Sequence, residues 1–421
     1  MKSSPVLVQL QGKDVIFVGA GKGRNMAGVR TFLEQHGNIK SFTGVDKQSG
    51  VAPLDFLRQY DSSSTIFIKN ESIPGTDMPV PYITSMQLFF ELASDLGIRT
   101  VGITGTKGKS TTSALTAHIL KTAGKPVVLA GNIGVSPLPA LGEATDATIF
   151  VLELSSYQLA DLRRSPNVSA CTNLYNDHTD WHGSLEAYWE AKHNIMRYTG
   201  PDDLFVYNPT FPVLVEWAAT ATCRTHAIDT EATLDLSNTQ LFGEHNRLNA
   251  LIAREVVREF GITDEQFRRG LESFAPLEHR TQVVATKHGI TYIDDAIGMT
   301  PESTMASLKA ISEKYERIGC LLLGGQDRNY DFGELMQRIA SYAVPMLVLF
   351  PDTIQKMRAA LPPGYHPDIF ETTDMAEAVR LAAAHAPKDS AVVLSTAAPS
   401  YSLWKDFEDK GDQFQAAVGL L

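Results

Sequence analysis

The chain has 421 residues, of which 43% are hydrophobic and 20% are charged, and its formal net charge is −11. This composition is typical of a globular chain of about three domains. The acidic balance argues against general binding to nucleic acid or to a membrane surface, because both favour a basic face. The three cysteines, Cys171, Cys223 and Cys320, are odd in number and widely spaced, which indicates neither a disulfide framework nor a zinc site.

No apolar run reaches the ~18 residues that a membrane span needs, and the first 14 residues lack the apolar core of a signal peptide. We therefore expect a cytoplasmic enzyme that acts as a monomer, with no membrane or nucleic acid partner.

The chain opens with a strand pattern at residues 14–19 (DVIFVG), followed by a glycine-rich turn and a helix to about residue 35. This start is typical of a dinucleotide-binding unit, but Arg24 stands where that fingerprint requires glycine. Asp46 follows the next predicted strand, where an acid would hold a ribose or a base; a solvated turn acid explains it equally well. A third strand is predicted at residues 65–69, before a turn cluster.

Residues 100–112 (TVGITGTKGKSTT) predict a strand that turns through a phosphate-binding loop into a helix. Gly105 and Gly108 let the backbone approach phosphate oxygens, so that successive N–H groups point inward. Lys109 would reach the β- and γ-phosphates, and the Ser110 hydroxyl would ligate Mg²⁺. The GxxGTxGKS sequence differs from the general P-loop pattern and is a more specific motif.

An acid follows the next long apolar run, residues 148–152 (TIFVL), which is typical of a buried parallel strand. Glu153 would therefore lie at the carboxyl end of a central strand, where it is well placed to bind Mg²⁺. A charge at a helix N-terminus is the alternative interpretation.

The helix predicted after Ser184 places a lysine on its apolar face. Lys192 is spaced i+7, i+4 and i+3 from Leu185, Tyr188 and Trp189. A neutral, desolvated lysine amine reacts with CO₂ to form a carbamate, which is an anionic oxygen ligand suited to Mg²⁺. A snorkelling lysine is the alternative. His178 lies in the acidic turn before this helix, and taken alone it would be a surface residue.

The rest of the chain alternates strands, loops and helices, which predicts a second doubly wound α/β domain. Asn246 and Asn249 fall on one face of a helix, where they would read an adenine edge or serve as turn and cap residues. Residues 281–286 and 290–294 predict a hairpin, and Thr300 would open the next helix.

Seven stretches together resemble the Mur ligase superfamily in their order and spacing. They are residues 102–112 (GITGTKGKSTT), 152–159 (LELSSYQL), 176–192 (NDHTDWHGSLEAYWEAK), 243–250 (GEHNRLNA), 279–280 (HR), 321–332 (LLLGGQDRNYDF) and 394–411 (LSTAAPSYSLWKDFEDKG). The resemblance implies three α/β domains: a Rossmann-like UDP-binding domain (1–93), a central P-loop ATPase domain (94–277) and a Rossmann-like C-terminal domain (278–421).

The resemblance also implies an activity, the ATP-dependent addition of glutamate to UDP-N-acetylmuramoyl-L-alanine in cytoplasmic peptidoglycan precursor synthesis. The substrate carboxylate would attack the γ-phosphate of ATP, and the glutamate amine would then attack the acyl phosphate. Two Mg²⁺ ions and the phosphate loop would neutralise the developing charge. The alternatives are another amino-acid ligase of the superfamily, such as a folylpolyglutamate synthase, or a non-catalytic nucleotide-binding homologue.

Roles follow for the residues that match the motifs. ATP would be held by Gly105, Thr106, Lys107, Gly108, Lys109, Ser110, Thr111, Asn246, Asn249, Arg280 and Asp295. One Mg²⁺ would be held by Ser110 and Glu153, and the second by His178 and carbamylated Lys192. Lys109, Glu153, His178 and Lys192 form the implied catalytic set. The substrates would be contacted by Asp46, Ser72, Gly75, Asn132, Arg328, Ser400 and Phe407.

The pattern differs from the family at the implied glutamate pocket. D-glutamate ligases of the family read DSKATN where this chain reads DAIGMT, so Ile297 and Met299 replace a lysine and a threonine. Arg328 stands where lysine is usual, and arginine grips a carboxylate bidentately. The Thr-Pro-Glu run at 300–302 is similar to a branch that adds L-glutamate. We expect D-glutamate, with L-glutamate as the alternative.

Overall fold

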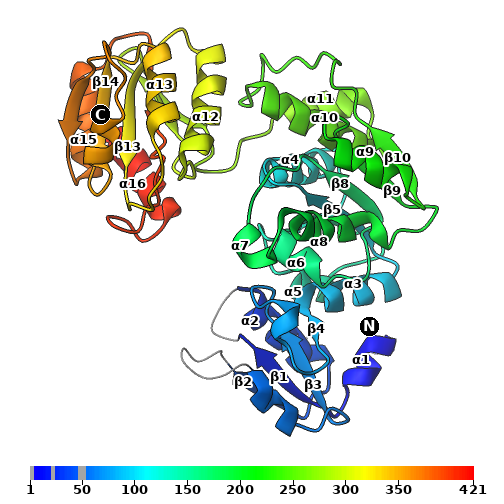
Figure 1. Cartoon of the computed structure of the whole chain (residues 1–421). Coiled ribbons are helices and arrows are strands. Elements are labelled where there is room, and N and C mark those ends of the chain that lie inside the picture. The colour runs from blue at the N-terminus through cyan, green and yellow to red at the C-terminus, as the bar shows by residue number, and fades with distance from the viewer. Residues whose placement is uncertain (1–3, 20–23, 46–53) are drawn as a thin grey trace. The chain divides into compact units, whose positions relative to one another are not determined.

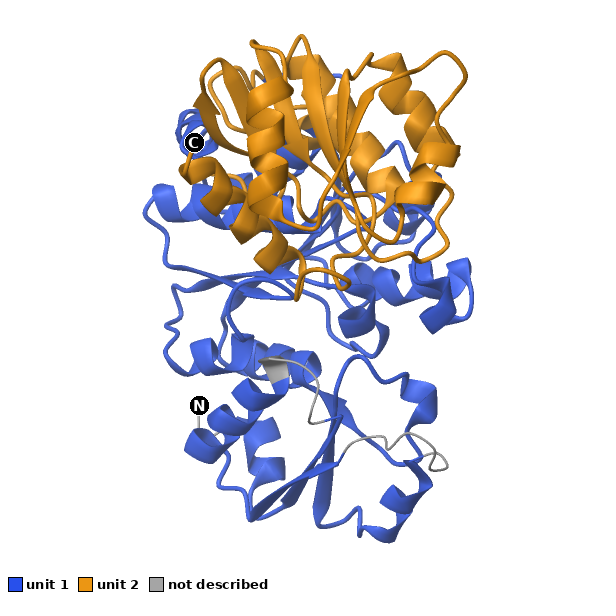
Figure 2. Ribbon diagram, turned by 90° about the vertical axis from the view of Figure 1, so that its left-hand side faces the viewer, with its two compact units in different colours: residues 1–234, 248–274 blue, residues 235–247, 275–421 orange. Residues whose placement is uncertain are grey.

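The computed structural model describes residues 4–19, 24–45 and 54–421, and the chain divides into two compact units (Figure 2). Unit 1 comprises Met1–Leu234 and Leu248–Phe274, and unit 2 comprises Asp235–Arg247 and Ala275–Leu421. Three separate sheets alternate with helices along the chain (Figure 1), which confirms the predicted α/β class. The domain boundaries near residues 93 and 277 stay a prediction.

The N-terminal sheet of unit 1 is parallel, with strand order β2-β1-β3-β4. Its elements are β1 (Asp14–Val18), β2 (Ser41–Val45), β3 (Thr65–Lys69), β4 (Ile83–Thr84), α1 (Pro5–Leu10), α2 (Arg24–His36), α3 (Ser85–Asp95) and the 3₁₀ turns η1 (Leu54–Gln59) and η2 (Gly75–Asp77). β3 coincides with the predicted strand. Asp46 lies outside the described residues.

The central sheet is also parallel, with strand order β10-β9-β8-β5-β7-β6. Its strands are β5 (Arg99–Thr104), β6 (Val127–Gly131), β7 (Ile149–Glu153), β8 (Val168–Cys171), β9 (Leu204–Tyr207) and β10 (Arg224–Ala227). The helices are α4 (Lys109–Thr122), α5 (Pro137–Gly142), α6 (Ser156–Ala160), α7 (Thr179–His182), α8 (Leu185–Arg197), α9 (Pro212–Ala219), α10 (Glu244–Arg258) and α11 (Asp264–Glu272).

The strand that leads into the phosphate loop lies inside this sheet, between β7 and β8. β7 is buried along its whole length, as its continuous apolar sequence predicts. Glu153 is the last residue of β7 rather than the residue after it, and it pairs in register with Ile103 of β5 and Gly131 of β6. The register therefore places its carboxylate at the edge where the phosphate loop begins.

One hydrophobic core joins the two sheets of unit 1, with Phe89 of α3 packed 5.1 Å from Phe150 of β7 between ring centroids. Residues of both sheets belong to this core, so the loops at their strand ends are held on a shared support.

Unit 2 contains a mixed sheet of strand order β11-β12-β16-β13-β14-β15, parallel except for the β11–β12 hairpin. Its strands are β11 (Gln282–Lys287), β12 (Ile290–Asp294), β13 (Ile318–Gly324), β14 (Met346–Phe350), β15 (Asp368–Glu371) and β16 (Ser390–Leu394). The helices are α12 (Pro301–Lys314), α13 (Gly333–Ser341), α14 (Ile354–Ala359), α15 (Met375–His385) and α16 (Phe407–Gly419). The predicted hairpin is confirmed, and so is the Thr300 cap of α12.

Candidate active site

The phosphate loop joins β5 to α4 and depends on two glycines. Gly105 and Gly108 have φ angles of 146° and 80°, a region that favours glycine. A Cβ at Gly105 would lie 1.9 Å from Thr172 Oγ1, and one at Gly108 would lie 2.4 Å from Asn249 Oδ1. The loop thus leaves no room for side chains at these positions. The approach of this backbone to phosphate oxygens stays a prediction.

Side chains outside the loop fix its shape. Asn173, just after β8, accepts from the backbone N–H groups of Thr106 (2.9 Å, through its carbonyl) and Lys107 (2.8 Å, through Oδ1). Lys109 Nζ donates to the carbonyls of Gly105 and Thr106, both at 2.9 Å, so its amine is held at the loop. The lysine is therefore positioned beside the backbone that would cradle a phosphate.

The first turn of α4 follows directly, and it carries Ser110, which is buried, and Thr111, which is half-buried. A helix N-terminus concentrates unpaired N–H groups and positive potential, both of which attract phosphate. The loop and the helix therefore contribute to one anion-binding site.

Glu153 provides the negative charge at this edge. Its side chain is 1% exposed, and Oε1 accepts from Asn132 Nδ2 at 2.9 Å. Oε2 is buried and has no hydrogen-bond partner among the described residues. A buried carboxylate oxygen without a partner is costly, and a hard cation such as Mg²⁺ would satisfy it. The residues present therefore fit a magnesium ion.

Lys192 of α8 faces inward, as its place on the apolar stripe predicted. It is 1% exposed, and its Nζ donates to the carbonyl of Gly105 at 2.9 Å and to Thr104 Oγ1 at 3.3 Å. Desolvation lowers the pKa of this amine well below its ordinary value, and the positive charge of Lys109 lowers it further. The neutral, nucleophilic amine is thereby favoured. α8 begins after a Ser184 cap, as predicted.

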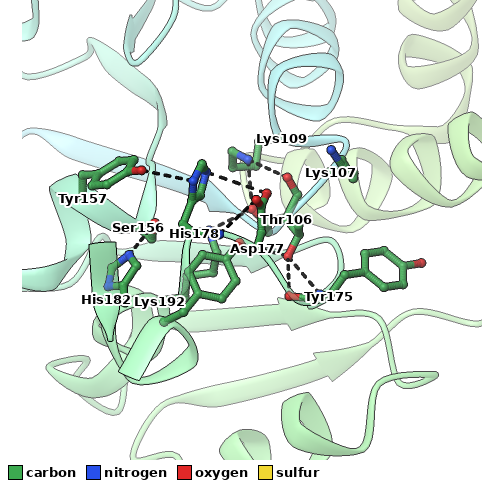
Figure 3. Close-up of polar contacts among 12 residues, drawn as sticks. Thr106, Lys107, Lys109, Ser156, Tyr157, Tyr175, Asp177, His178, His182 and Lys192 are labelled. Atoms are coloured by element: carbon green, nitrogen blue, oxygen red, sulfur yellow. Dashed lines mark hydrogen bonds and ion pairs between the residues drawn. The ribbon is translucent and has the colours of Figure 1, made fainter. Parts of the chain in front are cut away.

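His178 lies in the same neighbourhood, and Figure 3 shows it with Asp177, Lys109 and Lys192 beside the loop. It caps α7 at a φ of 50°; its Nδ1 lies 3.1 Å from the Tyr157 hydroxyl and its Nε2 3.7 Å from Asp177 Oδ2. No group of three His, Cys, Asp or Glu side chains within the described ranges could hold a metal ion. A second ion would therefore need phosphate oxygens or a carbamate as further ligands.

A cavity of about 440 Å³ lies at the junction between the N-terminal and central sheets of unit 1. Its lining includes Asn70, Ser72, Asn132, Ser155, Tyr157 and Trp181. Two of the predicted substrate residues, Ser72 and Asn132, thus line one cavity, and Asn132 connects it to Glu153. Gly75 packs instead against Tyr82 and Asp161, where an added Cβ would lie 2.3 Å from the tyrosine hydroxyl.

The two predicted adenine contacts lie on α10, which begins in unit 2 and continues into unit 1. Asn249 belongs to unit 1 and is buried beside Gly108, and Asn246 belongs to unit 2 and donates to the carbonyl of Phe242 at 3.0 Å. The structure thus places Asn249 at the phosphate loop, and its contact with adenine stays a prediction.

The remaining predicted residues belong to unit 2. Arg280 and Asp295 flank the hairpin, and Asp295 is 3% exposed and accepts from Thr281 (3.1 Å) and from Ser395 Oγ (2.7 Å). Burial raises the pKa of Asp295 to about 6. Its contact with a ribose stays a prediction.

The residues of the implied glutamate pocket lie on three loops that hydrogen bonds join. Ala397 N donates to the carbonyl of Gly298 and Gln326 N to that of Pro399, both at 2.9 Å. Ser400 is fully buried, and its Oγ lies 3.9 Å from Met299 Sδ. Arg328 is exposed and donates to Gln326 Oε1 at 3.2 Å, and Phe407 begins α16.

The fold forms two polar contacts, one in each unit, that the sequence did not indicate. His279 Nδ1 lies 2.7 Å from Asp294 Oδ2, and this carboxylate raises the pKa of the histidine. Tyr188 Oη lies 3.0 Å from Thr106 Oγ1, which ties α8 to the phosphate loop. The available signal was the occurrence of polar residues at the ends of apolar strands, but it does not identify their partners.

None of the described helices has the length and apolar character that a membrane crossing requires.

Comparisons with known proteins were made for the sequence and for the fold. A family model described as Mur ligase middle domain matches residues 103–239, and one described as Mur ligase, glutamate ligase domain matches residues 279–398. The chain is 30% identical to the UDP-N-acetylmuramoylalanine–D-glutamate ligase of Natranaerobius thermophilus, over 87% of this chain and 85% of that protein. It is 31% identical to the UDP-N-acetylmuramoyl-L-alanine–L-glutamate ligase of Salinispora tropica, over 98% of each chain.

Among solved structures, the fold is similar to that of the MurF ligase of Thermotoga maritima in complex with ADP. The TM-score is 0.64 at 17% identity, over 98% of this chain and 97% of that one. The UDP-N-acetylmuramate–alanine ligase MurC of the same organism gives the same TM-score at 18% identity, over 97% and 99% of the two chains. At these identities the similarity concerns the fold.

Proposed function

The chain belongs to the Mur ligase family, and from that membership we propose that it is an ATP-dependent ligase that joins glutamate to UDP-N-acetylmuramoyl-L-alanine in cytoplasmic peptidoglycan synthesis. One observation supports the proposal most directly. The amines of Lys109 and Lys192 both donate to the carbonyl of Gly105, and Glu153, whose Oε2 has no hydrogen-bond partner among the described residues, ends the neighbouring strand β7. Asn132 links Glu153 to the adjoining cavity.

The reaction has two steps. The muramoyl-alanine carboxylate attacks the γ-phosphorus of ATP, forming an acyl phosphate and releasing ADP. The amine of glutamate then attacks the acyl carbon and loses a proton, and phosphate leaves as the amide forms. Because a carboxylate and a triphosphate repel each other, Lys109 and the loop N–H groups must offset the charge as it develops. Asn132 would orient the carboxylate side of the substrate in the cavity.

Magnesium would add further positive charge between the carboxylate and the triphosphate. In our proposal Ser110 and Glu153 hold one ion, and His178 and the carbamate of Lys192 hold the second. The carbamate forms when the neutral Lys192 amine attacks CO₂ and loses a proton. Two observations support this arrangement: the lowered pKa of Lys192, and the buried Oε2 of Glu153, which has no hydrogen-bond partner among the described residues.

The enantiomer of glutamate is the finer part of the proposal. D-glutamate is the first candidate. L-glutamate is the second, favoured by Met299 at the position where D-glutamate ligases carry threonine. Ser400 in this structure faces the Met299 sulfur, so the pocket differs where a substrate carboxylate would be bound.

Incubating the protein with ATP, Mg²⁺, UDP-N-acetylmuramoyl-L-alanine and either D- or L-glutamate tests the proposal. We expect phosphate release together with a product heavier by one glutamyl residue, with one enantiomer strongly preferred. Lys109→Ala serves as the inactive control. If no phosphate is released with either enantiomer or with any of a panel of other amino acids, the proposed function is wrong.

A further inference from the structure

A further buried lysine, Lys69, lies outside the phosphate site. It is the last residue of β3, and its side chain is fully buried. Its Nζ lies 2.8 Å from Asp161 Oδ2 and also donates to the backbone carbonyls of Ile73 and Asn70. Because an unpaired buried ammonium is costly, this pair strongly favours the single arrangement that satisfies it.

The acid of the pair, Asp161, lies in the part of unit 1 that contains the central sheet. Asp161 caps the C-terminal end of α6, and it also accepts from the Tyr82 hydroxyl at 2.6 Å. Gly75 fits closely against both groups, since an added Cβ would lie 2.7 Å from Asp161 Oδ1. The ion pair therefore ties the segment that follows β3, residues 70–75, to the end of α6.

Both of these elements contribute to the wall of the cavity. Asn70 and Ser72 line it from the loop of residues 70–75, and Ser155 and Tyr157 line it from the start of α6. A second tie joins the loop to α7, because Trp181 Nε1 donates to the carbonyl of Ser72 at 3.0 Å.

α6 is in turn fixed to the helix that carries Lys192. Asn194 Nδ2 of α8 donates to the carbonyls of Leu159 (2.9 Å) and Ala160 (3.3 Å) at the end of α6. The Lys69–Asp161 pair thus attaches the loop of residues 70–75 to α6, and the hydrogen bonds from Asn194 fix α6 against α8.

We propose that Lys69 and Asp161 are positioning residues whose buried ion pair sets the spacing between these two elements in the wall of the 440 Å³ cavity, and so the affinity for the nucleotide-linked substrate. The inference rests on the proposed function in assigning that substrate to the cavity. Neither residue lines the cavity, so their effect passes through the loop of residues 70–75 and through α6.

Three variants test the pair: Lys69→Met, Asp161→Asn and the double variant. Asn at position 161 retains an acceptor for Tyr82 but removes the charge. Each variant should raise the KM for UDP-N-acetylmuramoyl-L-alanine about tenfold or more, the equivalent of ~1.4 kcal/mol of binding free energy. The kcat and the KM for ATP should stay within about twofold, because the phosphate site is not touched. The double variant should resemble the single ones, since the two residues act as one unit.

The matched control is Ile68→Val, which loses a buried methylene from the same strand without touching the ion pair. It should lower stability but leave the KM for the nucleotide-linked substrate unchanged. If it changes that KM as much as Lys69→Met does, or if the effects of the two single variants multiply in the double variant, the positioning role is wrong.

Hydrogen exchange provides a measurement that does not depend on the reaction. The backbone amides of Glu71, Ser72, Ile73 and Gly75 should exchange about tenfold faster in Lys69→Met than in the wild type, while those of α4 should not change. Unchanged exchange in the loop overturns the inference even if the enzyme turns over. Failure of the wild type to release phosphate overturns the proposed function but leaves this measurement valid.

Discussion

Lys192 in unit 1 and Lys410 in unit 2 are both almost fully buried, but only Lys192 has a nearby cation that lowers the pKa of its amine. Lys192 contacts a carbonyl and a hydroxyl; the charge of Lys109 disfavours its protonation, and Cys171, Asp177 and Glu153 favour it to a smaller extent. Lys410 donates to Thr396 Oγ1, and Asp294 and Asp295 favour its charged form. Burial lowers both pKa values, and for Lys410 the carboxylates limit the fall to about 7.

The comparison teaches that burial alone does not make a lysine reactive. A nearby cation adds to desolvation and leaves a neutral nucleophile, whereas nearby carboxylates retain part of the charge. Lys192 therefore suits carbamate formation. Lys410 suits a structural role, because it holds the segment from β16 that carries Ser400 through its bond to Thr396.

Removing the amine of Lys192 should have the largest effect on activity. Lys192→Ala should lower phosphate release by about 100- to 1000-fold, since a group that stabilises transition-state charge is lost. A short carboxylic acid should restore part of the activity by replacing the carbamate oxygens.

The control for this change is Lys121→Ala, which removes an exposed lysine from the last turn of α4 and should leave activity unchanged. Depleting dissolved CO₂ should lower the activity of the wild type but not of Lys192→Ala. Activity of Lys192→Ala within about tenfold of the wild type would contradict the assignment of Lys192 as a reactive amine.

A second prediction, with a smaller expected effect, concerns the space available at Gly108 in the phosphate loop. Gly108→Ala should raise the KM for ATP about tenfold, because its Cβ would lie 2.4 Å from Asn249 Oδ1 and would displace the loop. Gly124→Ala is matched in backbone conformation, with a φ of 83° against 80°, but its Cβ would meet nothing within 4 Å.

Both glycine variants should lose about 1–2 kcal/mol of unfolding free energy from the left-handed conformation. Only Gly108→Ala should change the KM for ATP. Equal KM values in the two variants would mean that the space at Gly108 is not needed for nucleotide binding. Steady-state kinetics and denaturant unfolding measure the two effects separately.

The residues of the unit 1 site differ in how far the sequence predicts them. The inward orientation of Lys192 could be predicted from its helical spacing after a serine cap. The position of Glu153 at the end of a buried strand could be predicted from an apolar run followed by an acid. These are local patterns, so their period and their ends are visible in the chain. β3 was predicted at its observed bounds for the same reason.

The ion pairs that support the site were not predicted. Lys69 ends strand β3, whereas Asp161 follows helix α6, 92 residues later in the chain. His279 and Asp294 come into contact only because the chain folds back at the hairpin. Spacing along the chain carries no information about such partners. The oxygen of Glu153 that has no partner is likewise a property of the packed site, because it depends on where Asn132 donates.

The last expected effect concerns the buried amine of Lys410 and is a dependence of stability, rather than of activity, on pH. The pKa of Lys410 is about 7 in the folded chain against an ordinary value of 10.5. Between these values the unfolded chain binds more protons, so the unfolding free energy should rise with pH from about 7 to 10.5. Below pH 7 both states are protonated, and the full cost of burying the charge is present.

Lys410→Met removes this proton and should flatten that rise relative to the wild type, by an amount on the order of a few kcal/mol across the window. Lys388→Met, which changes an exposed lysine of the same unit, should leave the wild-type rise intact. Denaturant midpoints at pH 7, 8, 9 and 10 compare the three proteins. If Lys410→Met keeps the same rise, then Asp294 and Asp295 hold the amine charged throughout, and Lys410 differs from Lys192 in its protonation state as well as in its surroundings.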